Sequence, residues 1–313
     1  LVVGGAGYIG GAVTDLLSKE GLDFTVYDNL LYEYQYMKPA NFIFGDVRDR
    51  DKLGKILPEY SHVVWLAAIV GDPACQVKPE LTRSVNQDAV EWLSKNYDGR
   101  IVFLSTCSVY GKNDNEVSED SELNPLSLYA ETKAKAEEFL KGKDSVIFRL
   151  GTVYGVSDTY SRIRMDLAVN YMTANAVTKG HLSIFGGSQW RPLIHVNNVA
   201  DAIVRALDAP VRGIYNISTS NYQIRELGAE IADITGCGIE YVKESFEDQR
   251  NYHASVDKAG EAGFLDFPKV WSVKDGSLQI KDLVESRRIK YTENDIYFNI
   301  RHITNLNSSG ELE

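Results

Sequence analysis

The start of the chain, LVVGGAGYIG, constrains the fold more than any other stretch. Three apolar residues run into Gly4, Gly7 and Gly10, and apolar positions at helical spacing follow to about residue 20. This order predicts a buried strand that turns through glycines into a helix. Such a turn gathers backbone N–H groups and the positive end of a helix dipole at one point, which suits a pyrophosphate. Glycines between a strand and a helix are a strong signal for dinucleotide binding.

An acidic residue follows at the distance that a dinucleotide site requires. The next expected strand, residues 24–27, ends at Asp28, which lies 24 residues after Gly4. A carboxylate there can accept hydrogen bonds from the adenosine ribose hydroxyls and would repel a 2′-phosphate. The position therefore favours NAD over NADP. The alternative is a turn aspartate in the pair Asp28-Asn29.

Strand and helix patterns alternate through the first half of the chain. The further strands are expected at 41–44, 62–66, 101–104 and 144–148, and the helices at 7–20, 49–57, 79–97 and 125–141. This alternation predicts an α/β fold with a Rossmann-type, doubly wound parallel sheet and right-handed crossovers. Ligands bind such sheets at the carboxyl ends of the strands.

The second half of the chain is less regular and indicates a smaller lobe. We expect an NAD-binding domain over residues 1–160, which also receives about 190–215, and a mainly nucleotide-sugar-binding α/β lobe over 161–313. The helices expected there are 161–178, 197–208 and 224–235, and the strands are 181–185 and 213–217. The tail beyond about residue 290 has few organising signals, so we expect it to wrap the surface.

Charge and cysteine content exclude several classes of protein. The formal net charge of −11 argues against a general nucleic-acid binder, because phosphate backbones require clustered Lys and Arg. No apolar run is long enough to span a bilayer and no signal peptide is visible, so we expect no membrane partner. Three widely spaced cysteines without a paired motif indicate a reducing, cytoplasmic compartment and no metal site. Because Leu1 already lies in the first expected strand, we expect the native chain to begin earlier.

Two segments near the expected sheet edge carry residues suited to redox chemistry. Thr106 follows the strand at 101–104, and the next helix carries Tyr129-x-x-x-Lys133. Residues four apart share a helix face, so an ammonium on Lys133 can stabilise the Tyr129 phenolate and lower its pKa. Thr106 can donate a hydrogen bond to an oxygen on which charge develops. Taken alone, Tyr-x-x-x-Lys is equally compatible with a solvated helix face.

As an ordered set, these motifs resemble the extended short-chain dehydrogenases/reductases of the NAD-dependent nucleotide-sugar epimerase/dehydratase family, UDP-glucose 4-epimerases in particular. The resemblance covers nearly the whole chain. It is carried by the glycine motif, Asp28-Asn29-Leu30, Gly45-Asp46-Val47-Arg48-Asp49, Asn86, Thr106 with Val109-Tyr110-Gly111, Tyr129-x-x-x-Lys133, Arg149-Leu150-Gly151-x-Val153-Tyr154-Gly155, Gly186-Gly187 and Arg191-Pro192-Leu193-Ile194-His195-Val196.

The resemblance implies a catalytic trio and an NAD site. Tyr129 would take the proton of the sugar hydroxyl while nicotinamide accepts the C4 hydride. Lys133 would bond the nicotinamide ribose, and Thr106 would orient the sugar oxygen. Asn86 would support the lysine through water, or would be an ordinary polar helix residue. The implied NAD-binding residues are Gly4, Gly7, Tyr8, Ile9, Gly10, Asp28, Asn29, Asp46, Val47, Leu66, Ala67, Ala68, Tyr129 and Lys133.

Several of these residues have a second interpretation. Asp46 could receive the adenine amino group, cap the helix at 49–57, or do both. His195 is expected to be structural, in a strand-to-helix turn. The family also implies a homodimer through the helices at 79–97 and 125–141, whose apolar stripes could instead serve the core.

Substrate contacts follow from the same resemblance. Arg191 and Arg250 match arginines that contact the nucleotide diphosphate, where bidentate pairing favours arginine. Asp166 stands near a place where the family carries an asparagine-containing pattern, and Arg162 and Arg164 could compensate or merely cover the helix surface. Asp72, Cys107 and Ser108 could face the sugar. For Asp72, the alternative is a turn aspartate in a tight loop that also contains a buried Cys75 thiol.

The residues after Thr106 discriminate between the reactions of the family. A 4,6-dehydratase carries an Asp-Glu pair there, and a sugar-acid decarboxylase a glutamate at the second place, whereas this chain has Cys107 and Ser108. A hydroxyl of ordinary pKa cannot replace a carboxylate in acid–base catalysis. We therefore expect a nucleotide-sugar epimerase acting at C4. The alternative is a 4-keto-deoxysugar reductase; a dehydratase, a 3,5-epimerase that uses Cys107 and a non-catalytic dinucleotide sensor rank lower.

Overall fold

The computed structural model describes residues 1–242 and 251–312. Its centre is a seven-stranded parallel sheet with the order β11-β7-β5-β4-β1-β2-β3. The strands are β1 (Val2–Val3), β2 (Thr25–Asp28), β3 (Asn41–Phe44), β4 (His62–Trp65), β5 (Arg100–Thr106), β7 (Ser145–Leu150) and β11 (Gly213–Ile217). The predicted fold class is therefore confirmed.

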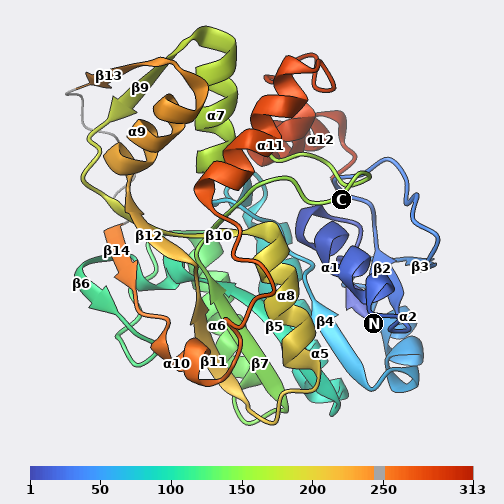
Figure 1. Cartoon of the computed structure of the whole chain (residues 1–313). Helices are drawn as coiled ribbons and strands as arrows, with labels where there is room; N and C mark the ends of the chain where they lie inside the picture. Colours follow the sequence, from blue (N-terminus) through green and yellow to red (C-terminus); the bar gives the residue numbers. More distant parts are fainter. Residues whose placement is uncertain (243–250, 313) are drawn as a thin grey trace.

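Helices cover both faces of this sheet (Figure 1). On one face lie α1 (Tyr8–Lys19) and α8 (Val196–Leu207), and on the other α2 (Arg50–Ile56), α4 (Pro79–Arg83), α5 (Ala89–Asn96) and α6 (Leu128–Leu140). Alternate side chains of β5 enter the two cores: Ile101 and Phe103 pack on one face, Val102 and Leu104 on the other. Burial on both faces explains why these strands are continuous apolar runs.

The second half of the chain forms a smaller group of elements around its own apolar cluster. It contains α7 (Ala168–Lys179), β9 (His181–Phe185), α9 (Ile224–Thr235), β13 (Gly238–Val242) and α11 (Val273–Glu285). Small sheets join the two groups: β8 (Thr152–Tyr154), β10 (Trp190–His195) and β12 (Ser220–Gln223) form one, and β6 (Lys112–Val117) pairs with β14 (Asn251–Ala254). The domain division at residue 160 stays a proposal, with α8 and β11 returning to the first unit.

The structure corrects several predicted elements. Residues 161–167 are not helical, because their N–H groups bond to distant segments: Arg162 N donates to Glu33 and Met165 N to the Tyr297 carbonyl. The helix predicted over 79–97 is interrupted by a π-helical turn, Ser84–Asp88. The loop after β4 contains a short helix, α3 (Asp72–Cys75). The tail forms α12 (Asn299–Ser309), which packs against α3 and the main core instead of wrapping the surface without structure.

The remaining elements are short. They are α10 (Asp257–Glu261) and the 3-10 turns Leu57–Glu59, Cys107–Tyr110 and Asp295–Tyr297. Within the described ranges, every helix is too short or too polar to cross a bilayer. The same residues contain no group of three metal-ligating side chains placed to hold an ion.

His195 occupies the turn between β10 and α8, as predicted. Its Nδ1 accepts a hydrogen bond from the Asn197 N–H, 3.1 Å away, and so caps the helix. Its Nε2 lies 2.9 Å from Gln279 Oε1, so the ring is neutral with its proton on Nε2. Burial lowers the pKa of His195 from 6.5 to about 4.

This pKa predicts a loss of stability in mild acid. Between pH 6.5 and 4 the unfolded chain binds a proton at His195 and the folded chain does not, so stability falls as pH falls through this window. The contribution is about 3 kcal/mol. We expect urea unfolding of a His195→Asn variant to depend less on pH over this range than that of the unmodified chain. His181→Asn, at an exposed position, is the control; equal pH dependence in both variants would contradict the prediction.

Candidate active site

A cavity of about 1230 Å³ runs along the carboxyl edge of the sheet and into the second group of elements. Most of the expected site residues line it: Gly4, Gly7, Tyr8, Ile9, Gly10, Asp28, Asn29, Asp46, Val47, Leu66, Ala67, Ala68, Asp72, Thr106, Ser108, Tyr129, Lys133, Arg164, Asp166 and Arg191. Asn86 and Cys107 are not in its wall, and Arg250 lies outside the described residues.

The glycine turn meets the conditions for a diphosphate. Gly4 has φ +80°, and a Cβ there would lie 2.4 Å from the Ala67 nitrogen, so the turn passes against the end of β4 without room for a side chain. The N-cap of α1 is Gly7, which has no side chain to cap the helix. The first N–H groups of α1 have no acceptor within the helix and stand at the cavity wall. They are suited to the diphosphate of a dinucleotide.

Asp28 makes the contacts expected of a turn aspartate and also lines the cavity. One carboxylate oxygen accepts the Ala6 N–H at 3.0 Å and the other the Leu30 N–H at 2.7 Å, so the side chain ties the glycine turn to the segment after β2. Burial raises the pKa of Asp28, while these N–H groups oppose the shift. The carboxylate also lines the cavity, and each oxygen has capacity to accept from a ribose hydroxyl.

Asp46 is held by its neighbours and does not cap α2. The Arg48 guanidinium donates to both of its oxygens at 2.9 Å, and Asn29 Nδ2 donates at 3.0 Å. Burial would raise the pKa of Asp46, but these partners hold it below the ordinary value. The cap of α2 is Asp49, which accepts the Lys52 N–H. The helix-capping interpretation of Asp46 is therefore wrong.

The three residues of the predicted trio all line the cavity, with Thr106 and Lys133 at the carboxyl end of β5. Thr106 is the last residue of that strand, and its Oγ1 accepts the Ser108 N–H at 3.1 Å, which leaves the hydroxyl proton for another acceptor. Tyr129 and Lys133 lie in the first turns of α6, which Ser127 caps. The buried Lys133 ammonium donates to the Leu104 carbonyl at 2.8 Å and lies 4.7 Å from the Phe103 ring centre.

The electrostatics of the trio differ from the expectation. Burial raises the pKa of Tyr129, Cys75 and Asp72 add to the shift, and Arg164 is the cation that opposes it. Burial lowers the pKa of Lys133 from 10.5 to about 8. The prediction that Lys133 lowers the Tyr129 pKa is not met, because a low-dielectric site disfavours the charged form of both side chains.

Asn86 is bonded to the loop after β4, which lines the cavity. Its Oδ1 accepts the Ile69 N–H at 2.8 Å and its Nδ2 donates to the Ile69 carbonyl at 2.9 Å, while Nδ2 lies 3.4 Å from Thr132 Oγ1. The amide thus holds the loop after β4 against α6. We assign Asn86 a positioning role for that loop.

The substrate-side residues form pairs around the trio. Asp72 accepts the Ser127 hydroxyl at 2.6 Å, and Arg164 donates to Asp166 at 2.6 Å. The Arg191 guanidinium lies 5.9 Å from the Tyr252 ring centre. Ser108 Oγ lies 3.4 Å from Tyr252 Oη.

Two thiols point away from the cavity. Cys107 is fully buried, and its Sγ contacts the Arg149 carbonyl at 3.3 Å, so the expectation that it contacts substrate is wrong. Cys75 does not line the cavity either; its thiol donates to the Ile69 carbonyl, which agrees with a buried structural role.

Sequence reasoning missed part of the cavity wall. The missed residues come from the loop after β2 and from α12: they include Tyr32, Glu33, Asn299, Ile300 and Leu306. Apolar spacing at Ile300, Ile303 and Leu306 could have revealed the helix. Its place over the cavity has no signal in the local sequence.

The position of Asp28 predicts a defined change in cofactor choice. Replacing it in an Asp28→Asn variant removes the charge that accepts ribose hydroxyls and repels a 2′-phosphate, so NAD should bind about tenfold or more weakly. Preference for NAD over NADP should fall at the same time. Isothermal titration with both cofactors measures this, with the exposed Asp51→Asn as control. Unchanged affinities for both cofactors would contradict the assigned role.

Lys133 should titrate near neutrality. Because its pKa is about 8, the ammonium is lost as pH rises through that value, earlier than in an ordinary lysine. The ¹³Cε resonance of Lys133, assigned by its loss in Lys133→Met, should show a midpoint near pH 8. A midpoint above about pH 10 would show that burial does not control this side chain.

Comparisons with known proteins agree with this geometry. The model of the NAD dependent epimerase/dehydratase family matches residues 1–218. A UDP-glucose 4-epimerase of Rhizobium meliloti is 30% identical over 245 residues, which are 68% of this chain and 73% of that protein.

Two solved structures share the fold over nearly their full length. The Thermus thermophilus UDP-glucose 4-epimerase in complex with NAD has a TM-score of 0.76 at 26% identity, covering 91% of this chain and 98% of that one. A dTDP-glucose 4,6-dehydratase of Streptomyces venezuelae with NAD bound has a TM-score of 0.77 at 25% identity, covering 92% and 97%. The chain belongs to the NAD-dependent epimerase/dehydratase family of extended short-chain dehydrogenase/reductase enzymes that act on carbohydrates.

Proposed function

We propose that this protein is a nucleotide-sugar 4-epimerase. The observation that carries the proposal is the composition of the cavity around Thr106, Tyr129 and Lys133. The two residues after Thr106 are Cys107, which is buried behind the wall, and Ser108, which lines it. The nearby carboxylates Asp72 and Asp166 are bonded to Ser127 and Arg164. The residues suit oxidation and reduction at one carbon better than elimination of water, which requires a carboxylic acid–base pair.

In this proposal the chain's own residues handle the proton and the developing charge. Tyr129, as the phenolate, accepts the proton of the C4 hydroxyl as the C4–H bond breaks and returns it when that bond re-forms on the other face. Burial opposes the phenolate form of Tyr129, and Arg164 favours it. Thr106 donates to the sugar oxygen, and Arg164 supplies positive charge near the phenolate, while Lys133 lines the same cavity. Bound NAD supplies a hydride acceptor that gives the hydride back, so the overall reaction is redox-neutral.

The substrate end of the cavity favours an anionic nucleotide. Arg191 is buried and lines the cavity beside Tyr252. Arg164 lines the same cavity and lies close enough to Tyr129 to lower its pKa. Guanidinium groups pair with phosphate oxygens in two-point contacts. The relatives named above act on UDP-glucose and dTDP-glucose, which supports a nucleoside diphosphate sugar as substrate.

We also propose that the protein is a cytoplasmic homodimer. The apolar stripe residues Leu81, Val85, Ala89 and Leu93 pack in the chain's own core. The outer positions of α6 carry exposed charges, Glu131, Lys135 and Glu138 among them. A dimer through these helices would therefore rest on polar contacts.

The proposal predicts epimer formation without net cofactor change. We expect at least one of UDP-, dTDP-, GDP- and CDP-sugars to yield its C4 epimer by NMR, with NAD and without any reductant. Tyr129→Phe should lower the rate by about 10²-fold or more, because it removes the proton acceptor. Tyr241→Phe, at an exposed tyrosine of β13, should retain full activity.

Two results would overturn the epimerase assignment. One is stoichiometric NADPH consumption with a 4-keto sugar and no redox-neutral interconversion, which would identify a reductase. The other is a Tyr129→Phe variant as active as the unmodified protein, which would remove Tyr129 from the chemistry.

A further inference from the structure

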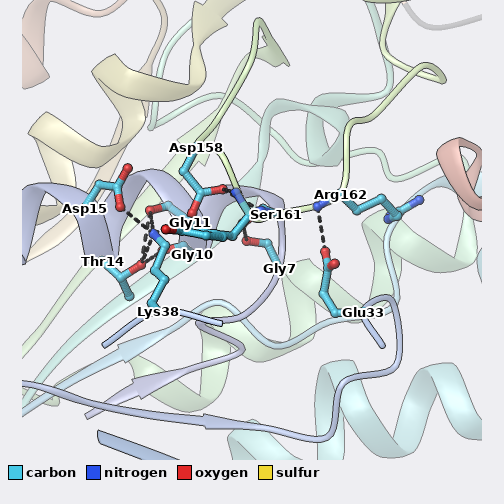
Figure 2. Close-up of polar contacts among 11 residues, drawn as sticks. Gly7, Gly10, Gly11, Thr14, Asp15, Glu33, Lys38, Asp158, Ser161 and Arg162 are labelled. Carbon is cyan, nitrogen blue, oxygen red and sulfur yellow. Dashed lines mark hydrogen bonds and ion pairs between the residues drawn. The ribbon is translucent and has the colours of Figure 1, made fainter. Parts of the chain in front are cut away.

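We propose that Lys38 and Asp158 are positioning residues of the cofactor site, holding two segments together over the outside of the glycine turn so that bound dinucleotide leaves slowly. The first segment is the loop between β2 and β3, residues 29–40. The second, here named the strap, is residues 157–166, which lead from β8 toward α7. Figure 2 shows Lys38 reaching the first turns of α1 beside Asp158.

The link between the two segments is a buried ion pair. Lys38 Nζ lies 2.5 Å from Asp158 Oδ2, and the side chains are 7% and 0% exposed. The same ammonium donates to the Gly11 carbonyl at 2.6 Å and to Thr14 Oγ1 at 2.8 Å, and it pairs with Asp15 at 2.7 Å. The loop is therefore fixed to both the strap and α1.

The strap rests directly on the backbone of α1. A Cβ at Gly11 would lie 2.2 Å from Ser161 Oγ and 2.7 Å from Asp158 Oδ1, so any larger residue would displace both side chains from α1. Asp158 Oδ1 also accepts the Ser161 N–H at 2.6 Å. Burial would raise the pKa of Asp158, but Lys38 and Ser161 hold it below the ordinary value, so the carboxylate is charged.

The C-terminal part of the strap is held by a second contact with the loop and by contacts with α12. Glu33, in the same loop, accepts the Arg162 N–H at 2.8 Å. The Arg162 guanidinium donates to the Ile296 carbonyl at 2.6 Å and to Asn299 Oδ1, and it lies over the Tyr32 ring. Asp166, at the end of the strap, accepts the Asn299 N–H at 2.9 Å. The strap is thus tied to the loop through Asp158 and Arg162, and to α12 through Asn299.

These contacts close one side of the cavity. Gly4, Gly7, Glu33 and Arg162 line the main cavity, whereas Lys38, Asp158 and Ser161 border a small hollow on the other side of the same turn. The loop and the strap therefore form a wall beside the point where the diphosphate binds. Parting them is costly because it leaves the buried Asp158 carboxylate without its cation, while Lys38 keeps its contacts with Asp15 and Thr14.

The consequence is slow exchange of the cofactor. The inference depends on NAD binding by this family and not on the sugar reaction proposed above. An enzyme that returns a hydride to the sugar it came from gains from such retention.

The test measures cofactor release directly and contains no sugar. Protein loaded with fluorescent NADH is mixed with excess NAD, and the loss of signal gives the rate of NADH release. Lys38→Met and Asp158→Asn should each release NADH about tenfold faster, which corresponds to about 1.4 kcal/mol. The double variant should be no faster than the quicker single one, because the two side chains act through one contact.

The control is Lys95→Met, which removes the exposed pair with Glu91 and should leave the release rate unchanged. Asp158→Asn preserves side-chain shape, so it carries the test if Lys38→Met does not fold. Folded variants that release NADH at the unmodified rate would overturn the proposal. An additive effect in the double variant would overturn it too, since the residues would then act separately.

Discussion

The close approach of the glycine turn to the end of β4 is the constraint on which the rest of the site depends. A side chain at Gly4 would collide with the backbone of Ala67, and one at Gly10 would collide with the carbonyl of Gly5. Because those places are empty, β1, α1 and β4 converge and the first N–H groups of α1 face the cavity. Asp28 then bonds to the same turn, so the element that suits the diphosphate and the residue that suits the ribose form one unit.

A second constraint lies next to the candidate trio. Glu137 of α6 and Arg149 of β7 form a buried ion pair at 2.7 Å, and the Ser105 hydroxyl donates to the same carboxylate. The Arg149 guanidinium also donates a hydrogen bond to Tyr110 Oη at 2.9 Å. Breaking one partner of such a pair typically costs about 3–5 kcal/mol. The network therefore sets α6, which carries Tyr129 and Lys133, against β5, which carries Thr106.

Local patterns in the sequence predicted the central unit well. The strand–turn–helix at the start, the order of the following strands and the spacing of Tyr129 and Lys133 are short-range features, and the structure reproduces the elements they describe. Predictions failed where a residue's neighbours come from far along the chain. Residues 161–167 are not helical, because their N–H groups bond to Glu33 and Tyr297. The tail at 299–309 is a helix, because its apolar side chains pack against the core.

The sequence by itself determined the α/β class, the dinucleotide turn, the preference for NAD and the identity of the candidate trio, because periodicity and motif spacing are properties of neighbouring residues. Only the tertiary structure decided that Cys107 faces away from the cavity, that burial raises the Tyr129 pKa, and that the loop after β2, the strap and α12 enclose the cofactor side. These properties depend on the distant segments that pack around each side chain. The spacing of residues within one segment of the sequence does not indicate which distant segments will contact it.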